Sequence, residues 1–510
     1  MMNLNQKQLE AVHFISGPLI IFAGAGTGKT NVIVHRIAYL LSLGISPSSI
    51  LAVTFTNKAA DEMKKRVFDI TSQIYQNKQN VWISTFHSFC AHLLRIEAIK
   101  IKLNPNFLIY DFIDQKNMIN SCIKDLNINE KKIKASAITN IISRAKDELK
   151  LPSDIMDDEA VTQNTFFKYS VLKIYDTYQK KMKKTGALDF GDLIMKTVTT
   201  FHKFPKILGN YQKKIKYVMV DEYQDTNHAQ YVLIKLLTKK YSNLCVVGDD
   251  DQSIYSWRGA DINNILNFSK DYPNAKSIKL EQNYRSTPRI LSAAYNVIKH
   301  NYTRINKQLW TKNQNTGLVT VIKAADEVDE ASKVANFISI NSHKYELSKF
   351  AILYRTNAQS RVFEDALKIK KIPYTLIGTL KFYERSEIKD ILAYLKIIHN
   401  PNDNISFKRI VNVPRRGIGK ISIEKLEKFA FAKNVSLLDA ISLAHDIDMT
   451  KKSLKALKSF AELISLFSKL KENNSVKTIS KKIITQSGYL KELEIENTQE
   501  SKIKIENIQE

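Results

Sequence analysis

Short apolar runs alternate with amphipathic stretches over the first part of the chain. The runs are rich in β-branched residues, and most end at glycine, aspartate or threonine, a pattern typical of strands buried in a parallel sheet. The alternation therefore predicts an α/β domain in which helices connect parallel strands. We expect strands at PLIIFAG (18–24), ILAVTFT (50–56), VWISTFH (81–87), YVMV (217–220) and LCVVGD (244–249).

Lysine-rich helical periodicity replaces this alternation between about residues 110 and 200, which predicts a helical insertion in the sheet domain. A second alternating region begins near residue 290, and helical patterns return from about residue 380. We therefore expect a first domain over 1–285 and a second over 286–510, with a sheet part at 286–380 and a helical part at 381–510. The expected strands of the second region are LVTVIKA (318–324), FAILYRT (350–356) and YTLIG (374–378).

The composition narrows the choice of partner. The chain has 510 residues, of which 44% are hydrophobic, enough for more than one packed core. Its formal charge is +26, from 77 basic and 51 acidic residues, which favours nucleic acid or a membrane surface as partner. A solvated, lysine-rich surface explains the same charge, so charge alone leaves these alternatives open.

The cysteine spacing and the N-terminus bear on the compartment. Cys90, Cys122 and Cys245 are far apart and match neither a disulfide framework nor a zinc site. The N-terminus lacks an apolar signal core, and no apolar run reaches the roughly 20 residues that cross a bilayer. We expect a soluble cytoplasmic protein without a membrane partner.

A glycine-rich segment, AGAGTGKT (23–30), lies between an expected strand and an expected helix. This is the context of a phosphate-binding loop, in which backbone N–H groups converge on phosphate oxygens. Lys29 would supply charge to the terminal phosphates, and the Thr30 hydroxyl would bind Mg²⁺. The alternative is a glycine-rich turn in an unrelated α/β protein. The expected ATP-binding residues are Ala23, Gly24, Ala25, Gly26, Thr27, Gly28, Lys29 and Thr30.

A second acidic segment follows the strand expected at 217–220. Asp221 at the strand tip would hold Mg²⁺, and Glu222 beside it would orient and deprotonate an attacking water. By itself this segment also fits a strand-end acidic turn. Together with the phosphate loop, it favours hydrolysis of ATP with Mg²⁺ as cofactor.

Aromatic and polar residues follow several of the expected strands. Phe55, Asn57 and His87 come at strand ends, where α/β sheets bind ligands, although each also fits ordinary packing. Tyr255 and Trp257 are two residues apart, and in an extended segment both rings project to the same side. Such a pair is a surface on which bases stack, and the adjacent Arg258 suits phosphate or a base. The alternative, two core aromatics, fits poorly with their polar neighbours.

Eight ordered motifs carry a family resemblance. The chain resembles the UvrD/Rep/PcrA group of superfamily 1 DNA helicases from its first residues to its last. One departure is Asn31, where many relatives have arginine. The motifs are LNQKQ (4–8), AGAGTGKT (23–30), TFTNKAADEM (54–63), STFHS (84–88), VDEYQD (220–225), VVGDDDQSIYSWRGAD (246–261), LEQNYRST (280–287) and LYRTNAQSR (353–361).

The resemblance implies two RecA-like motor domains, each interrupted by a helical subdomain, with ATP between them. It also implies 3′ to 5′ movement on single-stranded DNA. Gln8 would contact the adenine and Tyr284 would stack near the base, while Gln252 and Arg285 would reach the γ-phosphate. The residues expected along single-stranded DNA are Phe55, Asn57, His87, Tyr255, Trp257, Arg258 and Asn357. In VPRRGIGK (413–420), Gly417, Gly419 and Lys420 would contact duplex phosphates.

Two later motifs of the family are not found, one of which carries an arginine finger, and no arginine follows Arg416. An arginine finger contributes about 10³–10⁵ in turnover, so we expect impaired hydrolysis by this chain alone. The first hypothesis is an ATP-dependent DNA helicase in repair or replication restart, completed by a longer product or a second polypeptide. The competing hypotheses are an ATP- and DNA-binding module without turnover and, less well matched, a helicase–nuclease subunit.

Overall fold

The computed structural model describes residues 4–72, 81–129, 133–156, 165–315, 317–377, 385–443, 447, 449–471 and 473–509. The chain forms two compact units, which are described separately. Unit 1 comprises Met1–Gly317 with His399–Ile405 and Ser436–Leu438. Unit 2 comprises Leu318–Ile398, Ser406–Val435 and Asp439–Glu510. No helix among the described residues is long and apolar enough to cross a membrane.

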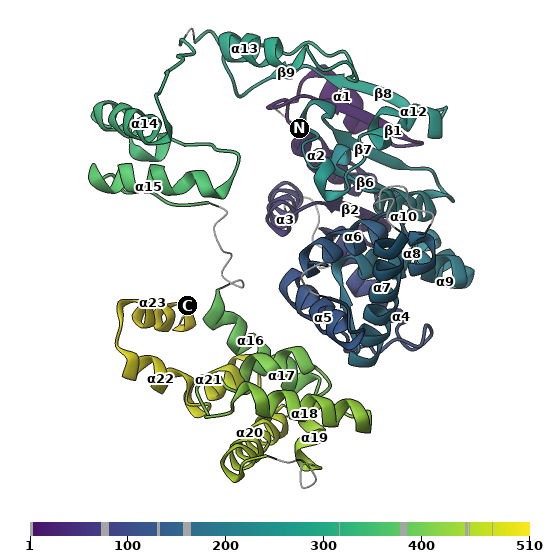
Figure 1. Ribbon diagram of the computed structural model, residues 1–510. Coiled ribbons are helices and arrows are strands. Elements are labelled where there is room, and N and C mark those ends of the chain that lie inside the picture. Colours follow the sequence, from purple (N-terminus) through teal and green to yellow (C-terminus); the bar gives the residue numbers. More distant parts are fainter. Residues whose placement is uncertain are drawn as a thin grey trace. The chain divides into compact units, whose positions relative to one another are not determined.

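A six-stranded sheet in the order β3-β2-β6-β7-β1-β8 is the centre of unit 1, and every strand pair in it is parallel (Figure 1). The predicted parallel α/β fold is therefore confirmed. Each of the five predicted strands forms, and β8 adds a sixth at one edge. The strands are β1 (Leu19–Ala23), β2 (Ile50–Thr54), β3 (Trp82–Thr85), β6 (Tyr217–Val220), β7 (Leu244–Gly248) and β8 (Lys276–Leu280).

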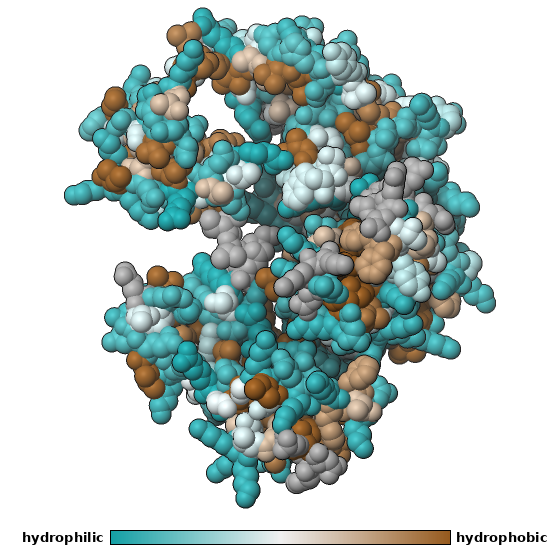
Figure 2. All heavy atoms as spheres, in the orientation of Figure 1, coloured by the Kyte–Doolittle hydropathy of each residue, from teal (hydrophilic) through white to brown (hydrophobic). Residues whose placement is uncertain are grey.

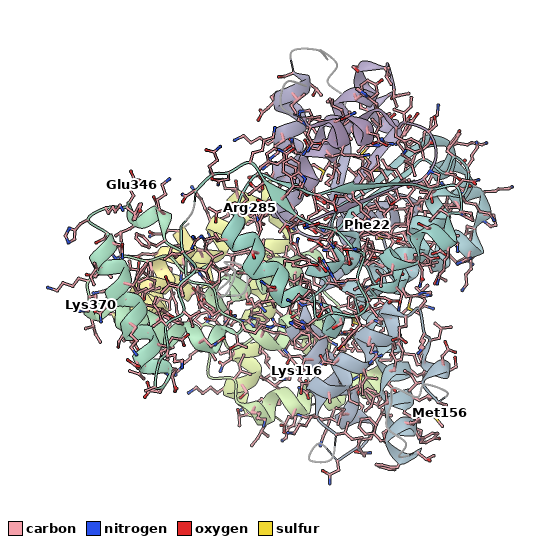
Figure 3. All side chains as sticks on the ribbon, turned by 90° about the horizontal axis from the view of Figure 1, so that it is seen from above. Phe22, Lys116, Met156, Arg285, Glu346 and Lys370 are labelled. Carbon is pink, nitrogen blue, oxygen red and sulfur yellow. The ribbon has the colours of Figure 1, made fainter. Side chains whose placement is uncertain are left out.

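Helices cover both faces of this sheet (Figure 1). Successive side chains of a strand point to opposite faces, so Ile20 and Phe22 enter one apolar cluster while Leu19 and Ile21 enter another. Phe22 is labelled within the sheet in Figure 3. Helices α1 (Gln6–His13), α2 (Lys29–Ser42) and α3 (Asn57–Thr71) cover the Leu19 face. Helices α4 (Phe86–Glu97), α8 (Phe190–Lys203), α9 (Pro205–Lys214), α10 (His228–Thr238), α11 (Asn263–Leu266) and α12 (Phe268–Asp271) cover the other.

The expected helical insertion is present between β3 and β6. Its helices α5 (Phe112–Asp125), α6 (Ala135–Asp147) and α7 (Thr165–Thr185) share an apolar core with β4 (Leu108–Tyr110) and β5 (Ala187–Asp189). Beside this core the side chain of Lys146 is fully buried and lies 2.5 Å from Asp189 and 3.0 Å from Asp192. Burial acts to lower the pKa of Lys146, but the two carboxylates outweigh it and the pKa is raised.

Asp147, at the end of α6, accepts a hydrogen bond of 2.8 Å from the Asn227 side chain. Burial, Asp189 and Glu148 raise its pKa to about 7, although Lys146 acts in the opposite direction. The ordinary value is 3.8, so between these two values the folded protein keeps a proton that the unfolded chain releases. This group therefore makes stability fall as the pH rises from about 4 to about 7.

We expect Asp147→Asn to raise the free energy of unfolding at pH 8 by at most about 4 kcal/mol, the equivalent of the full pKa shift. Asparagine keeps an acceptor for Asn227 without the charge. The gain should shrink to less than half at pH 5, as measured by urea unfolding at both pH values. Asp176→Asn removes an exposed carboxylate paired with Lys180 and serves as the control. An equal gain at both pH values would contradict the pKa assignment.

The chain after Gly317 is mainly helical. Helices α14 (Glu327–Asn341) and α15 (Ser360–Ile369) pack together around Ala335, Phe363 and Leu367. The helical pattern predicted from about residue 380 is also confirmed, although residues 378–384 lie outside the described residues. The helices are α16 (Ser386–His399), α17 (Asn404–Ile410), α18 (Lys420–Lys433), α19 (Leu437–Ser442), α20 (Lys451–Leu470), α21 (Val476–Gln486), α22 (Tyr489–Glu496) and α23 (Gln499–Gln509).

The strands predicted at 318–324, 350–356 and 374–378 do not form in the described residues, which exclude Gly378. That prediction was wrong because apolar alternation indicates only that one face of a segment is apolar. A strand also requires a neighbouring strand to pair with, and the pattern does not provide one. Leu318, Val321, Leu353 and Ile377 are 76%, 84%, 90% and 87% exposed. Elsewhere hydrophilic side chains cover much of the face seen in Figure 2.

Candidate functional site

The phosphate loop connects β1 to α2 at the carboxyl edge of the sheet. Lys29 is the first residue of α2, whose N-cap is Gly28 with a φ of 87°. Side chains other than glycine rarely adopt this left-handed conformation, which turns the backbone into the helix. The N-terminus of a 14-residue helix therefore faces the loop with free N–H groups, an arrangement that binds phosphate.

Lys29 and Thr30 meet the carboxylates that follow β6. The Thr30 hydroxyl donates to Asp221 Oδ2 at 3.0 Å, and Lys29 Nζ lies 3.6 Å from Glu222 Oε2. Burial and the neighbouring Glu222 raise the pKa of Asp221 to about 6, against the opposing effect of Thr30 and Lys29. A hydroxyl and a buried carboxylate are oxygen ligands that suit Mg²⁺, so the residues present fit this ion.

Glu222 and Gln8 each contact the phosphate loop or the residue that follows it. Glu222 has a φ of 52°, and its Oε2 accepts a hydrogen bond of 2.9 Å from the Gln224 side chain. Gln8 is 2% exposed and donates from Nε2 to the Thr27 carbonyl at 2.9 Å. The structure thus places the side chains of both predicted residues against the phosphate loop or Lys29.

The segment Gln282–Arg285, which begins with β9 (Gln282–Asn283), lies against the phosphate loop. The Asn283 amide donates to the Ala25 carbonyl at 2.6 Å, and Tyr284 N donates to the Gly26 carbonyl at 2.9 Å. The side chains of Tyr284 and Arg285 are exposed, and Arg285 is labelled in Figure 3. Tyr284 and Arg285, the two residues predicted to contact the nucleotide here, therefore lie near the phosphate loop within unit 1.

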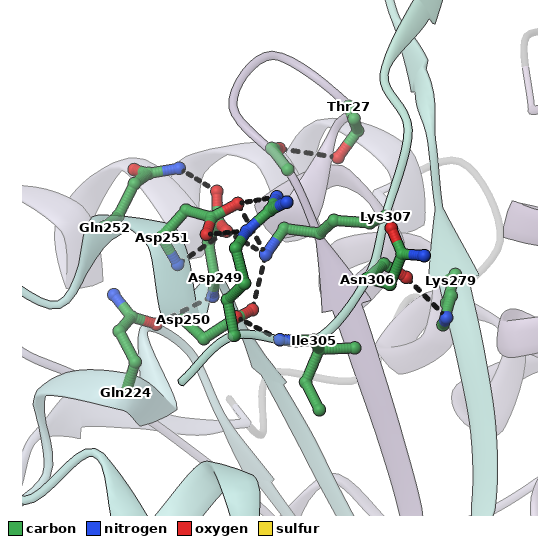
Figure 4. A network of polar contacts seen from close by, with 12 residues as sticks. Thr27, Gln224, Asp249, Asp250, Asp251, Gln252, Lys279, Ile305, Asn306 and Lys307 are labelled. Atoms are coloured by element: carbon green, nitrogen blue, oxygen red, sulfur yellow. Dashed lines mark hydrogen bonds and ion pairs between the residues drawn. The ribbon is translucent and has the colours of Figure 1, made fainter. Parts of the chain in front are cut away.

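The loop after β7 carries Asp249, Asp250, Asp251 and Gln252. The carboxylates of the three aspartates contact two cations. Lys307, which is 2% exposed, contacts all three of them (Figure 4). Arg304 forms two hydrogen bonds to Asp251, at 2.9 and 2.8 Å. Gln252 donates to Asp249 Oδ2 at 2.5 Å. Sequence reasoning found Gln252 but missed Lys307 and Arg304, since no motif links them to aspartates more than 50 positions away.

The aromatic pair lies a few residues further along. Tyr255 and Trp257 are 38% and 64% exposed, with ring centroids 6.5 Å apart. The predicted extended segment is wrong, because Ser256–Arg258 is a single 3₁₀ turn. Arg258 lies over both rings, 4.6 Å from the Trp257 centroid and 5.4 Å from that of Tyr255. The rings are nevertheless neighbours and reachable by solvent, so the alternative of two core aromatics does not hold.

The three other residues predicted to lie along single-stranded DNA in unit 1 differ in exposure. Phe55 is half-buried and packs edge-on against Phe86, with centroids 6.1 Å apart. His87 packs edge-on against Phe190 at 5.5 Å, and burial lowers its pKa to about 4, so its ring is neutral at pH 7. Asn57 is exposed at the start of α3.

The remaining predicted residues lie in unit 2. Asn357 is exposed in the 3₁₀ turn Asn357–Gln359. Gly417, with a φ of 73°, Gly419 and Lys420 are exposed around the start of α18. Arg416 was missed by sequence reasoning. Its guanidinium donates to the Ile410 and Val413 carbonyls, both at 3.0 Å, and thereby holds this turn.

The phosphate loop, the strand-tip carboxylates and the parallel sheet together define a P-loop α/β protein. The family model for the UvrD/REP helicase N-terminal domain matches residues 4–273, and that for the UvrD-like helicase C-terminal domain matches residues 278–510. The chain belongs to the UvrD/Rep helicase family.

Two relatives with high similarity are both named ATP-dependent DNA helicase PcrA. The protein from Staphylococcus epidermidis is 48% identical over 510 residues, and the match covers 100% of this chain and 69% of the relative. The protein from Staphylococcus aureus is 48% identical over 512 residues with the same two shares. The predicted domain boundary at residues 285–286 stays a prediction.

Proposed function

We propose that this chain is an ATP-dependent DNA helicase that moves 3′ to 5′ along single-stranded DNA in repair or replication restart. The observation that carries the proposal is the arrangement of unit 1. A phosphate loop bonded to strand-tip carboxylates lies at the same sheet edge as a loop that bears Gln252, Tyr255 and Trp257. The names of the relatives and the family membership support the same activity. A cytoplasmic location stays a prediction.

ATP would bind with its phosphates against the loop Gly24–Gly28 and with its base beside Gln8 and Tyr284. Mg²⁺ bound by Thr30 and Asp221 would neutralise charge on the phosphate oxygens. Lys29 and Arg285 would contribute positive charge to the terminal phosphates. Glu222 would accept a proton from the attacking water, and Lys29 Nζ lies 3.6 Å from its Oε2.

Single-stranded DNA would stack on the Tyr255–Trp257 pair, with Arg258 free to exchange its ring contacts for phosphate. Phe55, Asn57 and His87 would line the same path in unit 1. Asn357 would contact the strand from unit 2. The turn that holds Gly417, Gly419 and Lys420 would contact duplex phosphates through N–H groups and one positive charge.

We expect Trp257→Ala to weaken binding of an oligo-dT strand by about 1–3 kcal/mol, the range measured for one stacked base. Nucleotide affinity should not change, because the ring lies outside the phosphate loop. Fluorescence anisotropy of a labelled strand measures the first effect. Phe68→Ala, which removes another exposed aromatic, is the control and should bind as the wild type does. Equal affinity of Trp257→Ala and wild type would exclude stacking at this position.

Unwinding of tailed duplexes tests the proposed function. With Mg²⁺ and ATP, the chain should unwind a duplex that carries a 3′ single-stranded tail and not one with a 5′ tail. Because no arginine finger was found in the sequence, we expect unwinding by the chain alone to be slow. Preference for the 5′ tail would contradict the direction. Binding of both ATP and DNA without turnover would favour a binding module, and recovery of turnover by an added polypeptide would favour a split helicase.

A further inference from the structure

The side chain of Lys307 is enclosed by the aspartate loop, the segment Asp249–Asp251. Its Nζ lies 2.9 Å from Asp249 Oδ1 and 3.0 Å from Asp251 Oδ2, and it also donates to Asp250. The side chain is 1% exposed, and the side chains of Asp249 and Asp250 are buried as well. Three carboxylates this close repel one another unless cations compensate them, and Lys307 does so for all three while Arg304 also pairs with Asp251.

Asp249 connects this lysine to two residues of the ATP site. One oxygen pairs with Lys307, and the other accepts from Gln252 Nε2 at 2.5 Å. The Asp249 N–H donates to Gln224 Oε1 at 3.0 Å, and the amide nitrogen of the same Gln224 donates to Glu222 Oε2 at 2.9 Å. A continuous line of hydrogen bonds therefore joins Glu222 to Gln252 through Asp249 (Figure 4 shows the part from Gln224 to Lys307).

The segment that carries Lys307 is also fixed against the phosphate loop. Trp310 N donates to the Glu281 carbonyl at 3.0 Å, and β10 (Trp310–Thr311) pairs with β9. Leu309 covers Gly24 so closely that a β-carbon there would lie 2.4 Å from Leu309 Cδ2. One segment thus contacts both loops that surround the expected position of the terminal phosphate.

We propose that Lys307 is a positioning residue for Gln252 and acts on it through Asp249. The inference rests on the proposed ATP site, in which Gln252 turns toward the γ-phosphate. With Lys307 in place, Asp249 has one fixed orientation, so the Gln252 amide is held at the mouth of the site before the nucleotide arrives. Without Lys307, the Asp249 carboxylate turns away from those of Asp250 and Asp251, and Gln252 loses the hydrogen bond to Asp249 that holds its amide in place.

The ratio of dissociation constants for ADP and a non-hydrolysable ATP analogue tests this role. Gln252→Ala should lower the preference for the analogue by about 10- to 100-fold, the effect of one hydrogen bond to a charged group. Lys307→Gln should lower it to a similar extent, and the double variant should lose no more than Gln252→Ala alone. The control is Lys279→Ala, because Lys279 bonds the Asn306 carbonyl of the same segment at the surface.

Three results would overturn the proposal: a wild-type ratio in Lys307→Gln, additive losses in the double variant, or no preference for the analogue in the wild type. A purely structural lysine would lower the thermal midpoint and weaken both nucleotides equally. If Lys307→Gln does not fold, Arg304→Gln replaces it. This change removes the hydrogen bonds to Asp251 and the contact with the Tyr295 ring but leaves the Lys307–Asp249 pair, so it should lower the ratio by a smaller factor. An unchanged ratio there also counts against the role. Because the ratio requires no turnover, failure of the helicase proposal remains distinguishable.

Discussion

In the Glu222→Gln chain, ATP hydrolysis in the presence of single-stranded DNA is expected to fall by about 10²–10⁴-fold, the usual contribution of a general base. Glutamine keeps the size of the side chain and can still bond to Gln224, but it cannot accept the proton of the attacking water. ATP binding should persist, because Lys29, Thr30 and the loop N–H groups are unchanged.

Release of inorganic phosphate measures this effect, and a fluorescent ATP analogue measures binding. Glu62→Gln serves as the matched control, since Glu62 is an exposed carboxylate of α3 that pairs with Arg66. Unchanged phosphate release by Glu222→Gln would exclude Glu222 as the catalytic base. Loss of binding together with turnover would instead indicate a collapsed site.

The second large expected effect is a loss of stability when the buried Lys146 is replaced. Lys146→Met should lower the free energy of unfolding by about 3–5 kcal/mol, the cost of breaking a buried ion pair by removing one partner. Asp189 and Asp192 are 3% and 2% exposed and would lose their cation inside the insertion. The Tyr178 hydroxyl, which donates to Asp189 at 2.7 Å, cannot replace a full charge.

Urea unfolding followed by circular dichroism measures this loss. The control is Lys180→Met on α7, because Lys180 pairs with Asp176 in an exposed position and should cost less than about 1 kcal/mol. A loss below about 1 kcal/mol for Lys146→Met as well would mean that the insertion tolerates both carboxylates without the lysine.

Most of the first sheet could be predicted from sequence because strands such as β1, β2 and β7 are buried on both faces, whereas the half-exposed β8 was not predicted. Ile20 and Ile21 face opposite clusters, so the run 19–23 is apolar throughout and has a clear boundary at Gly24. The phosphate loop and the carboxylates after β6 were found for a related reason. Their residues are local in sequence, and the position after a strand is enough to assign them to one sheet edge.

Other features depend on contacts between distant positions. Lys307 and Asp250 are 57 residues apart, and Lys146 and Asp189 are 43 apart, so no periodicity connects either pair. The turn at Ser256–Arg258 was misread as extended because Tyr255 and Trp257 at a spacing of two fit a strand equally well. In unit 2, apolar alternation at 350–356 predicted a strand, but a strand also requires a partner.

We expect unit 1 to couple its ATP site to a surface for single-stranded DNA. The rate of ATP hydrolysis by the purified chain, measured against increasing oligo-dT concentration, tests it most directly. We predict that the rate rises with DNA to a plateau, and that Trp257→Ala reaches the same plateau only at higher DNA concentration. A rate that is the same with and without DNA would contradict the claim.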